Sequence, residues 1–400
     1  MTAERTPATG PASLRLERYP EPEVNLQAWN AADSYLLDWV AEHRTTGDGP
    51  CCVVNDSFGA LALGLVKAGE QLVVSWSDSW IAHEGARANA AVNNIAAEDV
   101  DWVPSTRTPS PPRPAAAFGL VVLRIPKAID QLQDQLRRLA PFVGPETLMV
   151  GGGMTKHIHT STIACFDDEI GPATTSRARK KARLIVARVD PDTPRPDADS
   201  LSASGRARIV GPTGLTFVSD PALFSSTRID RASALLLDAV GSNINWEPIT
   251  DVIDMGCGAG VIGLTLLERI GRLAMTFTDE SYGAVESSRA AWEENLAAGR
   301  LDQLDHDPRF IVDDCGSTIA DASADLVCIN PPFHDANTRT SAIADRMFAN
   351  SARILRPGGR IVVVGNRHLG YHSTLRRWFT TPTVIASDRR FVVLSAGSRR

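Results

Sequence analysis

The chain has 400 residues, of which 43% are hydrophobic and 22% charged, and its formal net charge is −6. This length exceeds one average domain and suits two, and the composition is that of a soluble globular protein. No apolar run is long enough to span a membrane, and the negative charge excludes a protein that is basic over its whole surface.

The start of the chain and its cysteines predict a cytoplasmic location. Residues 1–11 lack the basic region and apolar core of a secretory signal, and their composition predicts a frayed end. The six cysteines have no C-x-x-C spacing, and three of them (Cys51, Cys52, Cys328) lie within apolar runs. This usage is typical of buried thiols in a reducing compartment.

The two halves of the chain resemble each other at an offset of about 200 residues. Six segments match in the same order: 36–40 with 236–240, 53–60 with 252–259, 78–87 with 280–289, 120–123 with 326–329, 156–157 with 367–368 and 183–186 with 390–393. Each half also alternates strand-like and helix-like patterns. We therefore predict an α/β protein of two tandem, doubly wound, Rossmann-like domains.

The segment 190–204 mixes prolines with aspartates, which is typical of an exposed linker. We place the first domain at 1–190, the linker at 191–204 and the second domain at 205–400. A second proline-rich stretch, 104–114, is interpreted as a surface loop.

The two repeats differ at the positions where a site would lie. In the sequence alignment, four positions of the second repeat change in the first: Asp254 becomes Asn55, Gly256 becomes Ser57, Gly260 becomes Leu61 and Asn330 becomes Arg124. A leucine in a glycine turn would obstruct a ligand. We expect the first domain to be degenerate, with a role in substrate binding or in stabilising its twin.

The second repeat is organised around residues 252–266, where an apolar strand runs into a glycine-rich turn and then a helix. Glycine tolerates positive φ and lets a ligand approach the backbone, so Gly256, Gly258 and Gly260 are candidate cofactor contacts. Gly258, Gly260 and Gly263 also spell G-x-G-x-x-G, with an acid about 20 residues later, as in dinucleotide sites. A packing turn without a ligand is the alternative.

Four acids lie at the ends of the strands of this domain. Asp254 directly precedes the glycines, where it could face a cationic amino-acid group, which favours S-adenosylmethionine over NAD. Asp279 ends the next apolar run, where it could accept hydrogen bonds from ribose hydroxyls. Asp313 and Asp314 follow 310–312, and we expect Asp314 to accept the adenine amino hydrogen, the competing interpretation being a helix cap.

The fourth strand runs directly into Asn330-Pro331-Pro332-Phe333. An aromatic amine attacks a sulfonium methyl poorly because its lone pair is delocalised. The Asn330 side-chain oxygen and the Pro331 carbonyl can each accept one N–H and thereby orient that lone pair. The prolines add no competing donor, and Phe333 offers a face for stacking a base. Alone, the motif could be a turn, but its place favours catalysis.

The histidines carry less information. His334 is either a proton relay or a hydrogen-bonding residue of the loop. His157 and His159 have no cysteine or acid at ligand spacing, so we expect no metal.

Basic residues cluster at 177–183 and again at three arginine pairs, 376–377, 389–390 and 399–400. A solvated face is the usual meaning of such runs, but local cations are also the natural contacts of RNA phosphates.

Segments throughout the chain carry a family resemblance: 21–22, 25–29, 55–56, 58–60, 260–267, 278–281, 330–334, 366–369 and 391–394. With these residues the chain resembles bacterial class I methyltransferases that form N2-methylguanine in ribosomal RNA and carry a degenerate N-terminal copy of their catalytic domain. Within that group, it is more similar to the large-subunit (23S) enzymes.

The resemblance implies S-adenosylmethionine as cofactor, a seven-stranded sheet with an antiparallel last strand, and a guanine flipped into the C-terminal site. It also implies that Phe224, Ser225 and Asp230 lie over the cofactor. We expect methyl transfer to guanine N2 in 23S rRNA by a monomer without a membrane partner. The alternatives are 16S rRNA, protein glutamine or DNA adenine as substrate, or a non-enzymatic RNA-binding protein with a vestigial pocket.

Overall fold

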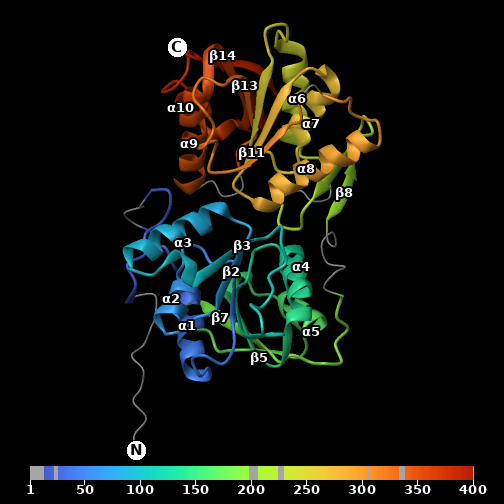
Figure 1. Ribbon diagram of the computed structural model, residues 1–400. Helices are drawn as coiled ribbons and strands as arrows, with labels where there is room; N and C mark the ends of the chain where they lie inside the picture. Colours follow the sequence, from blue (N-terminus) through green and yellow to red (C-terminus); the bar gives the residue numbers. More distant parts are fainter. Residues whose placement is uncertain are drawn as a thin grey trace, which may run out of the picture. The chain divides into compact units, whose positions relative to one another are not determined.

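A computed structural model describes residues 13–21, 26–197, 206–223, 229–304, 306–332 and 338–399, with only the backbone at 338–341. The chain forms two compact units, Met1–Gly205 and Arg206–Arg400 (Figure 1). Phe224, Ser225, Phe333 and His334 lie outside the described residues.

The first unit is a mostly parallel seven-stranded sheet covered by helices. The strand order is β3-β2-β1-β4-β5-β7-β6, and β7 is antiparallel to both of its neighbours. The strands are β1 (Cys51–Val54), β2 (Val73–Ser77), β3 (Val100–Pro104), β4 (Phe118–Arg124), β5 (Val143–Met154), β6 (Ala173–Thr175) and β7 (Ala182–Ala187). The helices are α1 (Ala31–His43), α2 (Ala62–Lys67), α3 (Trp80–Val92), α4 (Ile129–Leu139) and α5 (Thr160–Glu169).

The second unit repeats this topology. Its sheet has the order β12-β11-β10-β13-β14-β16-β15, with β16 antiparallel to both neighbours. The strands are β10 (Asp251–Met255), β11 (Ala274–Asp279), β12 (Arg309–Val312), β13 (Ala324–Ile329), β14 (Leu355–Asn366), β15 (Thr383–Ser387) and β16 (Phe391–Gly397). The helices are α6 (Arg231–Asn243), α7 (Val261–Ile270), α8 (Tyr282–Ala297), α9 (Thr338–Ile354) and α10 (Tyr371–Leu375), and β8 (Ala207–Val210) pairs with β9 (Thr216–Ser219).

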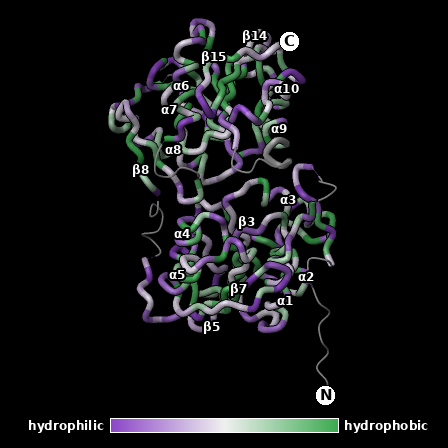
Figure 2. The backbone as a smooth tube through the Cα atoms, turned by 180° about the vertical axis from the view of Figure 1, so that it is seen from behind, coloured by the Kyte–Doolittle hydropathy of each residue, from purple (hydrophilic) through white to green (hydrophobic). Residues whose placement is uncertain are grey.

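The sequence pattern explains why both sheets are buried on two faces. In β10, Val252 packs into the core under α6, α7 and α8, whereas Ile253 and Met255 pack into the core under α9 and α10. Each such side chain stabilises the fold by about 1.5–3 kcal/mol relative to exposure. Figure 2 shows hydrophobic stretches running through the interior of each unit. The prediction of two tandem Rossmann-like domains, with an antiparallel last strand, is confirmed.

The strand register shows which residues of the two sheets are equivalent. Cys51 in β1 lies beside Leu120 in β4, and Val252 in β10 lies beside Leu326 in β13. Leu120 and Leu326 begin segments that match in sequence, so Cys51 is equivalent to Val252.

This equivalence corrects the sequence alignment by two residues at the turn after the first strand. Counting forward, Val53 takes the position of Asp254, and Gly59 takes that of Gly260, where we expected Leu61. Gly59 and Gly260 both have left-handed φ, 86° and 75°. The expected obstruction by Leu61 is therefore wrong. Apolar residues alone do not fix the phase between two parallel strands, because every position is buried and the hydrogen bonds set the register.

Candidate active site

The three glycines after β10 have different structural roles. Gly256, Gly258 and Gly260 all have positive φ, of 76°, 54° and 75°. A Cβ added to Gly260 would lie 3.0 Å from the Ser288 Oγ, and one on Gly256 would lie 3.2 Å from the Met347 Cε. A Cβ on Gly258 would meet no described atom within 4 Å. Gly258 therefore lines open space. Gly256 and Gly260 have a second reason to be glycine, because Met347 and Ser288 pack closely against them.

Asp254 is a buried carboxylate with one unsatisfied oxygen. It is 1% exposed, and its Oδ2 accepts the Gly263 N–H at 2.9 Å. Its Oδ1 has no hydrogen-bond partner among the described residues. Burial raises the pKa of Asp254 to about 7; the Gly263 N–H opposes this rise, and the nearby charge of Asp279 adds to it. An unsatisfied buried acceptor is unfavourable by roughly 1–3 kcal/mol, so this oxygen is suited to a cationic donor from a ligand.

Asp279, the last residue of β11, is hydrogen-bonded to the backbone of the glycine turn. Its Oδ2 accepts the Gly258 N–H at 3.1 Å, and its Oδ1 accepts the Ser281 N–H at 3.0 Å. Burial raises the pKa of Asp279, although these N–H groups oppose the rise. A carboxylate has about four acceptor positions, so each oxygen can still accept a hydrogen bond from a ligand hydroxyl.

The two aspartates after β12 have separate environments. Asp313 is fully buried and accepts hydrogen bonds from the Thr278 hydroxyl and from the backbone of Gly316 and Thr318. Asp314 instead receives two hydrogen bonds from the Arg346 guanidinium in α9, at 3.1 and 3.2 Å. Asp313 therefore stabilises the turn with both of its oxygens. Asp314 can still accept one more hydrogen bond at its Oδ2, and its contact with adenine stays a prediction.

Asn330 follows β13, and its amide orientation is determined by α6. Its Nδ2 donates to the Asp230 Oδ2 at 3.0 Å and to the Ser233 Oγ at 2.9 Å. Because an ionised carboxylate only accepts, the amide nitrogen must face Asp230. The Asn330 Oδ1 is buried and has no hydrogen-bond partner among the described residues. Pro331 is buried and Pro332 is exposed.

Arg124 takes the place of Asn330 in the first unit, as the alignment predicted. Its Nε lies 3.1 Å from the Asp33 Oδ1, and its Nη1 donates to the Ser57 Oγ. The Asp33 side chain is fully buried. Arg124 therefore bridges the helix that precedes β1 and the turn that follows it.

The bridge occupies the region that is open in the second unit. By register, Ser57 is equivalent to Gly258, and Asp33 and Ser233 are both the third residue of their helices. Arg124 therefore spans the position where Gly258 faces open space. At this turn the two units therefore differ by the Arg124 bridge rather than by Leu61.

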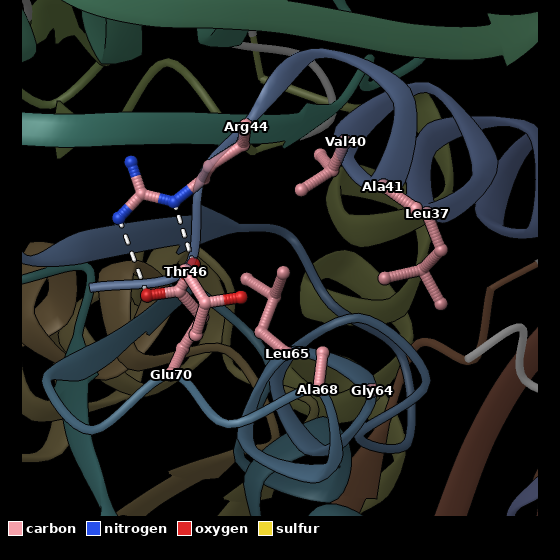
Figure 3. Close-up of a pocket in the computed structure, with 9 residues that line it drawn as sticks. All are labelled: Leu37, Val40, Ala41, Arg44, Thr46, Gly64, Leu65, Ala68 and Glu70. Atoms are coloured by element: carbon pink, nitrogen blue, oxygen red, sulfur yellow. Dashed lines mark hydrogen bonds and ion pairs between the residues drawn. The ribbon is translucent and has the colours of Figure 1, made fainter. Parts of the chain in front are cut away.

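A separate pocket in the first unit has two charged side chains in its lining, and they pair with each other (Figure 3). The Arg44 guanidinium and the Glu70 carboxylate form a buried pair, with Nε and Oε1 2.6 Å apart. Arg44 also donates to the carbonyls of Asp48 and Gly49. Leu37, Val40 and Leu65 provide apolar walls. We assign this pocket a structural role, since the ion pair closes the loop between α1 and β1.

The part of the chain that the structure describes has neither a metal-binding cluster nor a membrane-spanning helix. No group of three or more His, Cys, Asp or Glu side chains there could hold a metal ion. Nor does that part of the chain contain a helix that is long and apolar enough to cross a membrane. All six cysteines are free thiols, and all but Cys315 are buried.

Three contributors were not assigned to the site from sequence alone. Ser233 and Arg346 were missed, and Asp230 entered only through the family resemblance. Asp230-x-x-Ser233 is a helix N-cap pattern, and this signal predicts the start of α6. It does not predict that the cap faces the end of β13.

Comparison with known proteins covers nearly the whole chain. Residues 5–191 match the RLMG N-terminal domain, and residues 214–395 match the methyltransferase small domain. In three dimensions, the chain resembles the T. thermophilus 16S rRNA N2 G1207 methyltransferase in complex with AdoMet and guanosine. The TM-score is 0.71 at 20% identity, with 96% of this chain and 98% of that chain covered. At this identity the likeness shows a common fold.

Closer relatives share the full length. The ribosomal RNA large subunit methyltransferase G of Streptomyces coelicolor is 39% identical over 383 residues, covering 95% of this chain and 97% of the relative. The protein of the same name from Aeromonas salmonicida is 38% identical over 395 residues, with 98% of each chain covered. The chain therefore belongs to the ribosomal RNA large subunit methyltransferase G family.

Proposed function

We propose that the second unit transfers a methyl group from S-adenosylmethionine to the exocyclic N2 of a guanine in 23S rRNA. The observation that carries this proposal is the Asn330 Oδ1, a buried acceptor without a partner among the described residues at the end of β13. The names of the relatives support the large-subunit RNA as substrate. Action on ribosomal RNA would take place in the cytoplasm.

The residues around the glycine turn fit the cofactor. The unsatisfied Asp254 Oδ1 would receive its ammonium group, the open space at Gly258 would admit it, and the remaining acceptor positions of Asp279 would receive its ribose hydroxyls. Asp314 would accept the adenine amino hydrogen. When bound, S-adenosylmethionine supplies an electrophilic methyl group on a sulfonium sulfur.

The Asn330 Oδ1 and the Pro331 carbonyl would each accept one hydrogen of the guanine amine. Two fixed acceptors rotate the nitrogen lone pair out of conjugation and stabilise the positive charge that develops on nitrogen. The amine held by these two acceptors would take the methyl group as its bond to sulfur breaks, and the amine proton would leave to water. Asp230 keeps the Asn330 oxygen facing the amine, and Phe333 is proposed to stack on the base.

We propose that the first unit does not transfer methyl groups, because Arg124 bridges Ser57 and Asp33 where a cofactor would bind. Its role would be to hold RNA or to stabilise the second unit. The domain limits that we propose remain 1–190 and 205–400, with a linker at 191–204.

The test offers the full chain, with methyl-labelled S-adenosylmethionine, to separately purified and unmodified 23S and 16S rRNA. Mass spectrometry of the digested RNA then identifies the modified atom. We expect N2-methylguanine in 23S rRNA alone. Label on 16S rRNA only, on another atom, or on protein only would contradict the proposal.

A further inference from the structure

Four exposed arginines surround Asp388 in the turn between β15 and β16. They are Arg231, Arg367, Arg389 and Arg390, and we call them the Asp388 arginine cluster. We propose that this cluster binds the phosphates of the RNA strand on either side of the target guanine. The inference rests on the proposed function, because it assumes an RNA substrate.

Asp388 arranges the cluster through nearly all of its polar atoms. Its Oδ1 accepts the backbone N–H groups of Arg390 and Phe391, at 2.7 and 2.6 Å. Its Oδ2 lies 2.9 Å from the Arg231 Nη2, and its carbonyl accepts the Arg367 Nη1 at 3.1 Å. The two N–H groups, followed by the Arg231 guanidinium, lower the pKa of Asp388, so it stays ionised. Asp388 therefore fixes the Arg231 and Arg367 side chains and the backbone of Arg390, and a single carboxylate among four arginines leaves an excess of positive charge.

The cluster lies at the same edge of the sheet as Asn330. The carboxyl ends of parallel β13 and β14 meet at this edge, where Asn330 and Arg367 follow the two strands. Because β16 runs antiparallel, its first residue, Phe391, pairs with Asn366, which brings the β15–β16 turn to the same edge. Arg231 directly follows Asp230, whose carboxylate holds the Asn330 amide.

The arginines at the opposite edge make different contacts. Arg399 donates to the backbone carbonyls of Phe379, Arg377 and Arg376. Arg377 forms two hydrogen bonds with Asp345, at 2.9 and 3.0 Å. In contrast, Arg389 is exposed and has no hydrogen bond or ion pair to another described residue. At the catalytic edge, Arg389 thus presents its guanidinium group to solvent, whereas those of Arg377 and Arg399 at the other edge are bound within the protein.

Guanidinium groups suit phosphate chemically. Their planar N–H pairs match two phosphate oxygens, and they are weakly hydrated compared with an ammonium group. A flipped base keeps its backbone near the enzyme surface, so its flanking phosphates need positive partners. Such contacts position the strand and carry no sequence information.

The test measures binding of the full chain to a 23S rRNA fragment by fluorescence anisotropy over a range of salt concentrations. The variant Arg389→Gln with Arg390→Gln should bind roughly tenfold more weakly, with a salt slope lower by roughly 0.7 for each phosphate that the variant no longer neutralises. Cofactor affinity and melting temperature should stay at wild-type values. Arg376→Gln is the matched control, because it removes an exposed arginine from the opposite edge.

The double variant also removes the hydrogen bond from the Arg390 Nε to the Asn366 Oδ1, which could disturb the turn. The single variant Arg389→Glu leaves that bond in place. It should weaken RNA binding more than Arg389→Gln does. RNA binding by these variants at the wild-type level, or an equal loss in Arg376→Gln, would overturn the inference. If the wild type showed the arginine-dependent binding but made no N2-methylguanine, the proposed function would fail and the RNA surface would stand.

Discussion

The ends of β4 and β13 occupy equivalent places in two copies of one fold, but one has a cationic side chain, Arg124, and the other a neutral amide, Asn330. In the first unit, the Arg124 side chain forms an ion pair with the buried Asp33 carboxylate and donates a hydrogen bond to the Ser57 Oγ. In the second unit, Asn330 satisfies only its own nitrogen and leaves a buried oxygen without a partner among the described residues. A buried acceptor beside a cation of its own chain has its charge compensated without a ligand, whereas one with neither a cation nor a hydrogen-bond partner is suited to receive a donor.

The largest expected effect comes from removing that acceptor. Asn330→Ala should lower turnover by roughly 10²–10³, because the transition state then keeps only one of its two aligning acceptors. Cofactor affinity, measured by calorimetry with S-adenosylhomocysteine, should change little. A large loss of cofactor binding with little change in turnover would show that Asn330 does not primarily align the amine.

The ion pair between Arg124 and Asp33 in the first unit provides a second test. Arg124→Ala should lower the free energy of unfolding by roughly 3 kcal/mol, because it leaves the buried Asp33 carboxylate without its cation. Arg179→Ala is the control, since it removes an exposed ion pair with Asp38 on the same helix and should cost about 1 kcal/mol or less. Methyl transfer by the second unit should persist at temperatures where both variants are folded.

The Arg124→Ala loss should also depend on pH. Burial raises the pKa of Asp33 above its usual value, and Arg124 opposes that rise. A carboxyl whose folded pKa exceeds its unfolded pKa loses stability as pH rises between the two values. Denaturant titrations should therefore give a larger loss at about pH 8 than at about pH 5. Equal losses at both values would mean that Asp33 does not titrate in this range.

Gly258 sharpens the contrast between the open turn and the bridged one. Gly258→Ala should weaken S-adenosylhomocysteine binding by roughly tenfold, because its Cβ enters the space proposed for the cofactor. Gly271→Ala has the same combination of positive φ and open surroundings, at the end of α7. Both variants should lose about 1 kcal/mol of stability, but only the first should lose affinity. Equal affinities would place the cofactor elsewhere.

Asp230 is expected to act through Asn330. Asp230→Ala should lower kcat roughly tenfold and leave KM for the cofactor unchanged, because the amide can then rotate away from the reactive orientation. Asp230→Asn should restore much of kcat, since its amide oxygen still accepts. The loss of an N-cap costs about 1 kcal/mol by itself, and Ser79→Ala, which removes the cap of α3, controls for it. A fall in stability without a change in kcat would refute the positioning role.

The smallest effect is the pH dependence of cofactor binding. Burial raises the pKa of Asp254 to about 7, so protonation competes with binding of an ammonium group. Affinity for S-adenosylhomocysteine should rise several-fold between about pH 6 and about pH 7.5. Asp254→Asn should remove this dependence. An affinity that is independent of pH in the wild type would show that Asp254 is not the ammonium partner.

The fold was predictable because apolar runs mark strands buried on both faces, and the repeat supplied the same order twice. The phase of the first turn was not predictable, because the apolar residues of β1 and β10 can be aligned in more than one way and only hydrogen bonds distinguish the registers. The glycines, Asp279 and Asn330 follow strands directly, so their common edge could be inferred. The contacts of Ser233 and Arg346 depend on how α6 and α9 pack, and no local pattern encodes that packing.

The most direct measurement is a crystal structure of the full chain with S-adenosylhomocysteine and guanosine. We predict that the guanine N2 lies within about 3 Å of the Asn330 Oδ1, with the cofactor sulfur beside Gly258 and the Asp230 carboxylate still bound to the Asn330 Nδ2. A guanine whose amine faces away from Asn330, or a cofactor that does not occupy the space at Gly258, would contradict this prediction.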